Sequence, residues 1–251
     1  MKARMAAYGG YQLRDYLVGR GLLTLIAPGL AGWAYVTFSG VRYDALDPSL
    51  GIAARDQVHR TFTSVLSIFA LVAAAFAAQG LIARDRSRGY DQLWFSRAVS
   101  PLRYYLQGFV LSGLGAVLLG AAIADAYAIG VHPISVPGAA ACVALAWLAI
   151  GGLSFALSRW TAFHTPIVAA LVGVDFALQQ FAPTLRSTAA GAGLVEFGQY
   201  LLPPAHVVAA LSDPLVRGTL VDPRALIWPT VFGVACLAIA IVQLRRRPLG
   251  T

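Results

Sequence analysis

Few residues in this chain could support catalysis or nucleotide binding. Its only lysine is Lys2, so it lacks the Gly-x-x-x-x-Gly-Lys segment with which a P-loop holds nucleotide phosphates. Ser154 has a preceding Gly-Gly-Leu segment and His164 nearby, but the Gly-x-Ser-x-Gly elbow of a serine hydrolase is missing. The histidines and cysteines do not have the spacing of metal ligands. We therefore expect no catalytic residues, no metal site and no enzymatic activity.

The most informative segment is the arginine-rich stretch 84–103. Leu93, Trp94 and Phe95 follow one another inside it, between Gly89 and Pro101. Arginines beside a membrane span are explained by topology alone. Three successive large apolar side chains, however, need a lipid or protein surface to cover them. The pattern predicts a short amphipathic helix that docks on a partner.

This segment resembles the cytoplasmic loop of the type-2 ABC exporter permeases, which are six-helix membrane subunits whose ATPase is a separate chain. The family's loop carries an acid, a glycine, an apolar pair and a Ser-Arg-x-Val-Ser run ahead of the third helix. The matching positions here are Asp85, Gly89, Leu93, Trp94, Ser96, Arg97, Val99 and Ser100, followed by Tyr104 or Tyr105 and Gly108. Tyr90, Ala98 and Phe109 stand where the family has Thr, Pro and Lys.

The resemblance implies how the chain would be powered. In such permeases the loop is a coupling helix, which sits in a groove of the ATPase and moves when two ATPase subunits close on nucleotide. The implied partners are two separate ABC ATPase subunits that bind ATP and Mg, so this chain itself would hold no cofactor. A second permease, identical or related, would complete the path where the second and fifth helices of the two copies meet. The residues expected to contact the ATPase are Asp85, Gly89, Leu93, Trp94, Phe95 and Arg97.

Polar residues within the apolar runs are candidates for a translocation path. Asp175 interrupts the fifth run, where a carboxylate costs about 2.5–3.5 kcal/mol at mid-helix, so it should face protein or water. Gln179 shares its helix face, and Ser64 and Ser67 add hydroxyls to the second run. Two interpretations of Asp175 stay open: it lines the path, or it is a hydrogen-bonded acid that holds helices together. The alternative function is an ion-coupled secondary carrier or channel that uses Asp175.

The composition requires lipid around most of these elements. Of 251 residues, 58% are hydrophobic and 12% charged, and the mean hydropathy is +0.69, which excludes an ordinary soluble domain. Long uncharged runs predict helices, because a backbone in lipid must satisfy its own hydrogen bonds. We expect an all-α integral membrane protein with one domain, 1–251, and six spans. The expected spans are 21–41, 61–83, 104–124, 138–158, 160–182 and 225–244.

The net charge of +8 predicts the orientation. If the N-terminus is inside, 13 basic residues lie on the inner side and six on the outer, so both termini should be cytoplasmic. The resemblance implies a bacterial-type cytoplasmic (inner) membrane. Arginines dispersed among apolar runs do not indicate nucleic-acid binding, and membrane lipid is the expected surrounding.

Two further segments outside the spans have predicted structure. The first 20 residues suit either an N-terminal interfacial helix or a plain basic flank. The outer segment 183–224 is too long for a turn and too apolar for a solvated loop. We expect it to form short re-entrant helices before the last span, as at this place in the resembled family.

Overall fold

The computed structural model is all-helical in the part of the chain that it describes. That part comprises residues 52–76, 100–130 and 133–246, with the single positions 10, 14, 18 and 82. In chain order the elements are α3 (Ile52–Ala75), α6 (Pro101–Gly130), α7 (Val136–Ala146), the π-helix η3 (Trp147–Gly151), α8 (Gly152–Leu157), α9 (His164–Leu185), α10 (Ala189–Leu201), α11 (Ala205–Arg217) and α12 (Pro223–Arg246).

Five stretches of helix are long and apolar enough to cross a membrane, which supports a multi-pass membrane protein. They are Asp56–Ala75, Leu102–Ile129, Val136–Leu157, His164–Leu185 and Pro223–Arg245. The expected first span, 21–41, and nearly all of the N-terminal flank lie outside the described residues. Following the predicted orientation, the side on which α3 begins is called the outer side below.

The helices that contain the expected second and third spans extend beyond the expected bounds. The second span was predicted over 61–83; α3 begins at Ile52 and ends at Ala75, and residues 77–81 and 83 lie outside the described residues. In the first turns of α3, Asp56 and Arg60 form an i,i+4 ion pair of 2.8 Å, a type of pair that adds about 0.2–0.5 kcal/mol to helix stability. The third was predicted to end at 124, whereas α6 continues through Asp125 to Gly130. At 1.5 Å per residue this helix is longer than the roughly 30 Å hydrocarbon layer, so its charged end can lie beyond the lipid.

The fourth span contains a π-helical turn. Ser135 caps its start by accepting a hydrogen bond from the Gly138 N–H at 3.1 Å, and the helix then runs through α7, η3 and α8. A π turn inserts an extra residue into the α-helical ladder and is often found at functional sites. The helix of the next span starts at His164 rather than at residue 160, because residues 158–160 and 162–163 form turns and Thr161 between them has no regular structure.

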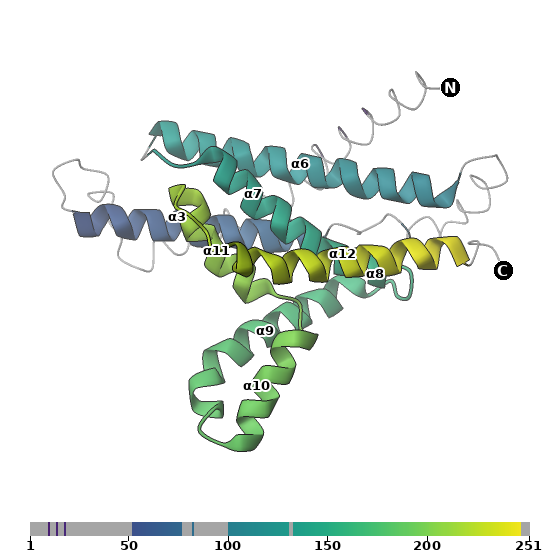
Figure 1. Cartoon of the computed structure of the whole chain (residues 1–251). Helices are drawn as coiled ribbons and strands as arrows, with labels where there is room; N and C mark the ends of the chain where they lie inside the picture. The colour runs from purple at the N-terminus through teal and green to yellow at the C-terminus, as the bar shows by residue number, and fades with distance from the viewer. Residues whose placement is uncertain are drawn as a thin grey trace.

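Glycines allow the central helices to approach closely. α7, η3 and α8 cross between α6 and α12, and α3 lies alongside (Figure 1). A Cβ at Gly113 of α6 would meet the Trp147 indole, and a Cβ at Gly233 of α12 would lie 2.5 Å from the Leu148 carbonyl oxygen. Such backbone approach is how helices associate in lipid, where the hydrophobic effect does not drive them together.

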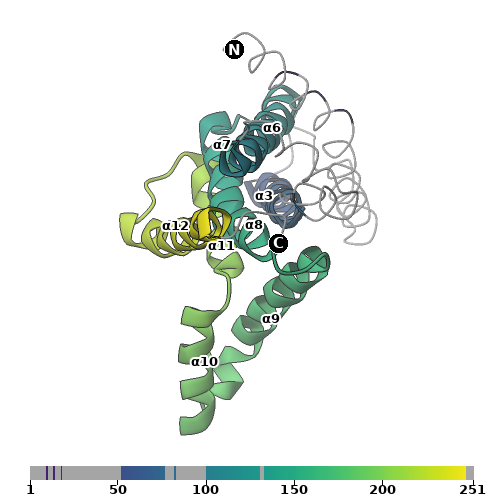
Figure 2. The same ribbon diagram turned by 90° about the vertical axis from the view of Figure 1, so that its right-hand side faces the viewer.

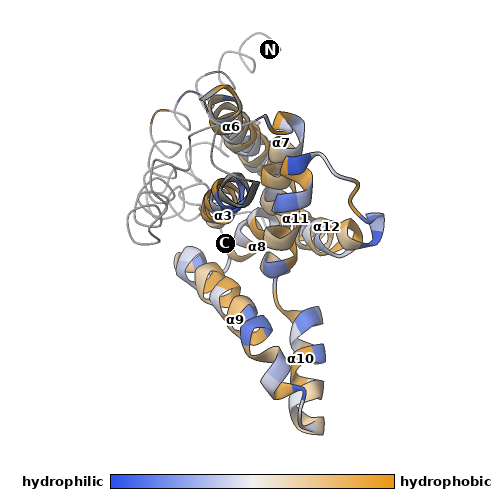
Figure 3. Ribbon diagram, turned by 90° about the vertical axis from the view of Figure 1, so that its left-hand side faces the viewer, coloured by the Kyte–Doolittle hydropathy of each residue, from blue (hydrophilic) through white to orange (hydrophobic). Residues whose placement is uncertain are grey.

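α9 and α10 form a hairpin that projects from this bundle (Figure 2). Only 17% of the α9 span is buried within the chain, compared with 67% of the α3 span. Apolar residues predominate along α9 (Figure 3), and Val174, Phe176 and Phe181 are exposed. This helix therefore needs lipid or a partner chain to cover it.

The glycine contacts give a test of this packing. Gly233→Ala is expected to lower the stability of the protein by about 1–3 kcal/mol, because the added methyl collides with the η3 backbone at Leu148. Gly173→Ala on α9 is the matched control, since a Cβ there has nothing within 4 Å. The measurement is the thermal unfolding midpoint of both variants in the same detergent. Equal midpoints for the two variants would contradict the close approach of α12 to η3.

Candidate functional site

Asp175 is buried and holds the start of α11. Its side chain is 1% exposed, and the carboxylate accepts a hydrogen bond of 2.8 Å from the backbone N–H of His206. The other oxygen lies 2.8 Å from His206 Nδ1, which donates when it carries the proton. The acid of the fifth span is thus paired with a residue 31 positions later in the chain. This geometry matches the interpretation of Asp175 as an acid that holds helices together.

The position of Asp175 also suits the electrostatics of α11. His206 lies in the first turn of α11, where unpaired backbone N–H groups carry partial positive charge. Pro204, at the N-cap, makes no side-chain hydrogen bond, so a carboxylate from α9 supplies the acceptor that α11 lacks. Sequence reasoning identified Asp175 but not His206, because the two are joined only by the fold.

Gln179 lies one turn beyond Asp175 and is half-buried. Its amide nitrogen Nε2 is buried and has no hydrogen bond within the part of the chain that the structure describes. Gln180, next to it, is exposed. A buried amide donor is expected to find a partner such as water or a bound molecule. Gln179 is therefore the path candidate with unused hydrogen-bonding capacity.

Ser64 and Ser67 use their hydroxyl protons within their own helix. Ser64 Oγ donates to the Arg60 carbonyl at 2.9 Å, and Ser67 Oγ donates to the Thr63 carbonyl at 2.8 Å. Ser67 is buried, whereas Ser64 is exposed. Such bonds to the preceding turn are common for hydroxyls in apolar helices. Within the described ranges neither serine is hydrogen-bonded to Asp175 or Gln179, so the four predicted path residues are not joined into one polar cluster.

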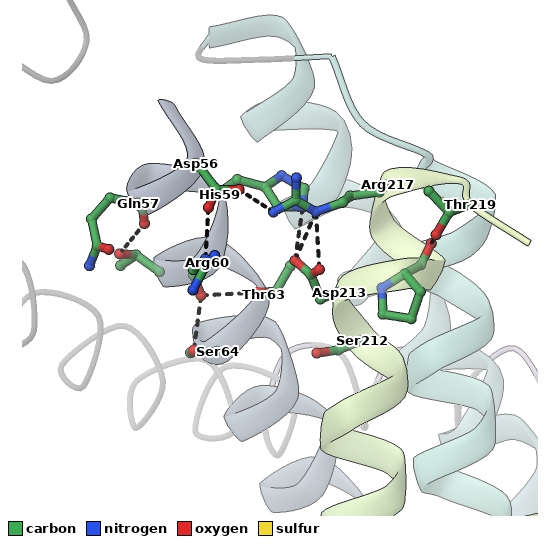
Figure 4. Close-up of polar contacts among 12 residues, drawn as sticks. Asp56, Gln57, His59, Arg60, Thr63, Ser64, Ser212, Asp213, Arg217 and Thr219 are labelled. Carbon is green, nitrogen blue, oxygen red and sulfur yellow. Dashed lines mark hydrogen bonds and ion pairs between the residues drawn. The ribbon is translucent and has the colours of Figure 1, made fainter. Parts of the chain in front are cut away.

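A second polar cluster joins the outer ends of α3 and α11 (Figure 4). Arg217 Nη2 lies 2.5 Å from Asp56 Oδ1, and Arg217 Nε lies 3.0 Å from Asp213 Oδ2. His59 Nε2 lies 3.4 Å from Asp213 Oδ1. The hydrogen bonds to Asp56 and Asp213 raise the pKa of Arg217, which keeps it charged. The sequence contains the i,i+4 pairs Asp56–Arg60 and Asp213–Arg217, but only the fold connects them.

The C-terminal end of α11 also packs on the start of α7. The Ser135 N–H donates to the Val216 carbonyl at 2.8 Å. A side chain at Gly138 would collide with the Leu215 carbonyl. Gly218 then ends α11 in the left-handed region, at φ 67°, which glycine adopts without strain. The α11 helix is thereby fixed to α9 at one end and to α7 and α3 at the other.

The residues that had suggested enzyme chemistry bond to backbone atoms. Ser154 is fully buried, and its Oγ donates to the Ala75 carbonyl at 2.9 Å. His164 Nδ1 lies 3.2 Å from the Thr161 carbonyl oxygen. Both cysteines, Cys142 and Cys236, are free and buried. Across the described ranges, His, Cys, Asp and Glu do not gather in a group of three that could hold a metal ion.

The predicted ATPase contact lies outside the described residues. This applies to all six of its members, which are Asp85, Gly89, Leu93, Trp94, Phe95 and Arg97. The end of the same loop is described from Ser100, and α6 begins at Pro101. The coupling contact accordingly stays a prediction from the residue pattern.

The Asp175–His206 pair gives a quantitative test. Asp175→Ala is expected to lower stability by about 1–3 kcal/mol, because it leaves the His206 N–H and Nδ1 without their acceptor. Asp175→Asn should lower stability less than Asp175→Ala does, since the asparagine side chain keeps one oxygen that can accept a hydrogen bond. Gln180→Ala, an exposed change on the same helix, is the control. Thermal unfolding midpoints in detergent measure the effect, and a midpoint of Asp175→Ala equal to that of the control would argue against the pair.

Comparison with known proteins gives no relative for this chain. It matches no protein-family model, no curated protein and no solved structure. The function proposed below therefore rests on the chain's own residues, on their geometry and on the resemblance of the segment 84–103.

Proposed function

We propose that this chain is the membrane subunit of an ATP-driven exporter and forms half of a dimeric translocation path. The observation that carries the proposal is the apolar triplet Leu93-Trp94-Phe95 inside the arginine-rich segment 84–103, in a pattern that resembles a coupling loop. An apolar triplet in a charged loop offers a docking surface, and Trp and Arg are favoured interface anchors. Because Lys2 is the only lysine, ATP and Mg would bind to two separate ATPase subunits.

The helices that the structure describes are compatible with this role. Five of them are long and apolar enough to span a membrane. The projecting hairpin leaves most of α9 without cover from the rest of the chain, and the resemblance puts the fifth helix near the path. We place the second permease, an identical or a related one, against α9, with lipid around the remaining faces. In this arrangement the chain resides in a bacterial-type cytoplasmic membrane.

The segment between α9 and α12 supports an outer cap. It forms two helices of 13 residues each, α10 and α11. A helix of this length is roughly 20 Å long at 1.5 Å per residue, which is too short to cross the roughly 30 Å hydrocarbon layer. We infer that both helices enter the outer leaflet and return, and that they cap the path. The outward direction of transport follows from the resemblance.

Among the proposed path residues, Gln179 and Asp175 would have different roles. Asp175 is already bonded to His206, so we assign it to holding α11 in place. Gln179 has a buried amide nitrogen that is not hydrogen-bonded to the described part of the protein, so we assign it to contact with water or substrate. Ser64 and Ser67 keep free lone pairs on their hydroxyl oxygens and would act as acceptors along α3.

An ion-coupled secondary carrier is the second candidate. The observation that favours it is a buried carboxylate in a span, Asp175, in direct contact with a titratable imidazole, His206. Ionisable groups of this kind form proton relays in membrane transporters. A carrier would need no ATPase, which separates the two candidates experimentally.

Co-purification of the tagged chain is the experiment that tests the exporter proposal. We expect an ATPase to accompany the chain from its native membrane, and the reconstituted complex to hydrolyse ATP and move a transported probe into vesicles only when ATP is present. Purification without an ATPase, together with transport driven by an ion gradient alone, would replace the exporter with the carrier.

Trp94 gives a sharper test at the predicted contact. Trp94→Ala is expected to reduce ATP hydrolysis by the reconstituted complex at least about tenfold, since truncating an interface anchor can cost about 2 kcal/mol or more. Trp160→Ala is the matched control, because Trp160 is 73% exposed in the turn between α8 and α9. Both variants are compared at equal amounts of assembled complex. A Trp94→Ala complex as active and as well assembled as the control would refute the docking role of this loop.

A further inference from the structure

We propose that Asp56, Asp213 and Arg217 form an outer latch that holds the outer ends of α3 and α11 together, and that α3 swings away from α11 when the latch opens. Arg217 is the central residue, because it contacts one carboxylate on α3 and one on its own helix. Figure 4 shows the guanidinium of Arg217 between Asp56 and Asp213. The role of the latch in closing the outer end of the path rests on the proposed function. The contact between the two helices does not depend on that function.

α11 is the fixed side of the latch. At its N-terminal end it is bonded to α9 through the buried Asp175 carboxylate. At its C-terminal end the Ser135 N–H bonds to the Val216 carbonyl, and Gly138 allows α7 to approach the α11 backbone. These contacts use backbone atoms and buried groups, so α7, α9 and α11 are expected to move as one unit.

α3 is the side that can move, because its two ends are held differently. Near its inner end, the buried Ser154 Oγ of α8 donates to the Ala75 carbonyl at 2.9 Å, and both residues lie in the core. At its outer end the buried Phe62 ring stacks on Tyr127 of α6 at 4.0 Å. The ion pairs to α11 at this end are partly solvated: the side chains of Asp56, Arg217 and Asp213 are 32%, 36% and 44% exposed. Water can replace such ion pairs at little net cost, whereas a buried hydrogen bond has no such substitute. The geometry favours a pivot near Ala75.

The polar residues of α3 lie at the end that would open. Its outer half carries Thr61, Thr63, Ser64 and Ser67, of which only Ser64 is exposed. His59 is also buried, with Nε2 3.4 Å from Asp213. Movement of α3 away from α11 would break that contact and admit water to this side of the helix. The latch would therefore control access to Ser67, which is the buried one of the two hydroxyls proposed to line the path.

Accessibility of a cysteine at position 212 tests the latch. Ser212 on α11 is 3% exposed and neighbours Asp213 (Figure 4). Ser212→Cys is introduced into a chain carrying Cys142→Ala and Cys236→Ala, which removes both native thiols. The probe is a water-soluble maleimide, and the protein is held in lipid nanodiscs, which expose both membrane faces.

Arg217→Ala and Asp56→Asn are each expected to raise the labelling rate at least about fivefold, because each removes the ion pair between Asp56 of α3 and Arg217 of α11. Added salt should accelerate labelling of the parent by screening the same charges. Arg60→Ala is the matched control. It removes another ion pair of Asp56, but one that lies within α3 and does not join the two helices. Its labelling rate should stay at the parent value. Only variants that elute as monodisperse protein with the parent's unfolding midpoint are compared. If Arg217→Ala does not fold, Asp56→Asn alone tests the latch.

The outcomes separate the latch from the exporter proposal. Parent-like labelling of both Arg217→Ala and Asp56→Asn would overturn the latch, and so would an equal increase in Arg60→Ala. Neither result depends on an ATPase. Adding the partner ATPase with ATP is a second arm: faster labelling of the parent supports the link to transport, whereas an unchanged rate removes that link and leaves the latch standing on the variants alone.

Discussion

The pairing of the Asp175 carboxylate with the start of α11 is the interaction on which the arrangement of the outer half depends. A charge in a membrane-spanning helix must be compensated, and Asp175 is compensated by the His206 N–H and imidazole. The carboxylate meets the positive end of the α11 dipole, while Arg217 lies at the negative end of the same helix. Both ends of a 13-residue helix are thus stabilised by opposite charge, which fixes α11 among α3, α7 and α9.

The remaining helices are held together mainly by close packing of complementary surfaces. Lipid is as apolar as the side chains, so burial of leucine or valine does not by itself bring two spans together. Close contact comes instead from glycine, at Gly113 against Trp147 and at Gly233 against Leu148. Both contacts involve residues of η3, whereas over its length α6 packs mainly on α7, and α12 packs on η3 and α8. Buried hydrogen bonds such as Ser154 to Ala75 add specificity.

Contacts in the centre and on the inner side of the molecule differ in strength from the contact on its outer side. The central and inner contacts are dry and use backbone, whereas the outer contact between α3 and α11 uses charges that water can reach. The proposed transport role would need such an unequal distribution, because one side would have to open while the bundle stays assembled. The hairpin of α9 and α10 is different again: it is exposed and apolar, so its environment must be supplied by lipid or by another chain.

The sequence by itself determined the class of protein and the approximate place of five helices, because apolar runs and backbone satisfaction in lipid are local constraints. It also indicated that Asp175 needs a partner. It further predicted short helices in the segment 183–224, where α10 and α11 lie. The uncharged run did not indicate that α3 begins at Ile52, because the helix extends over charged residues such as Asp56 and Arg60, which pair one turn apart. Only the tertiary structure decided that Asp175 meets His206 and that Arg217 meets Asp56 across 161 positions, because a side-chain pair so distant in the chain leaves no periodic pattern to find.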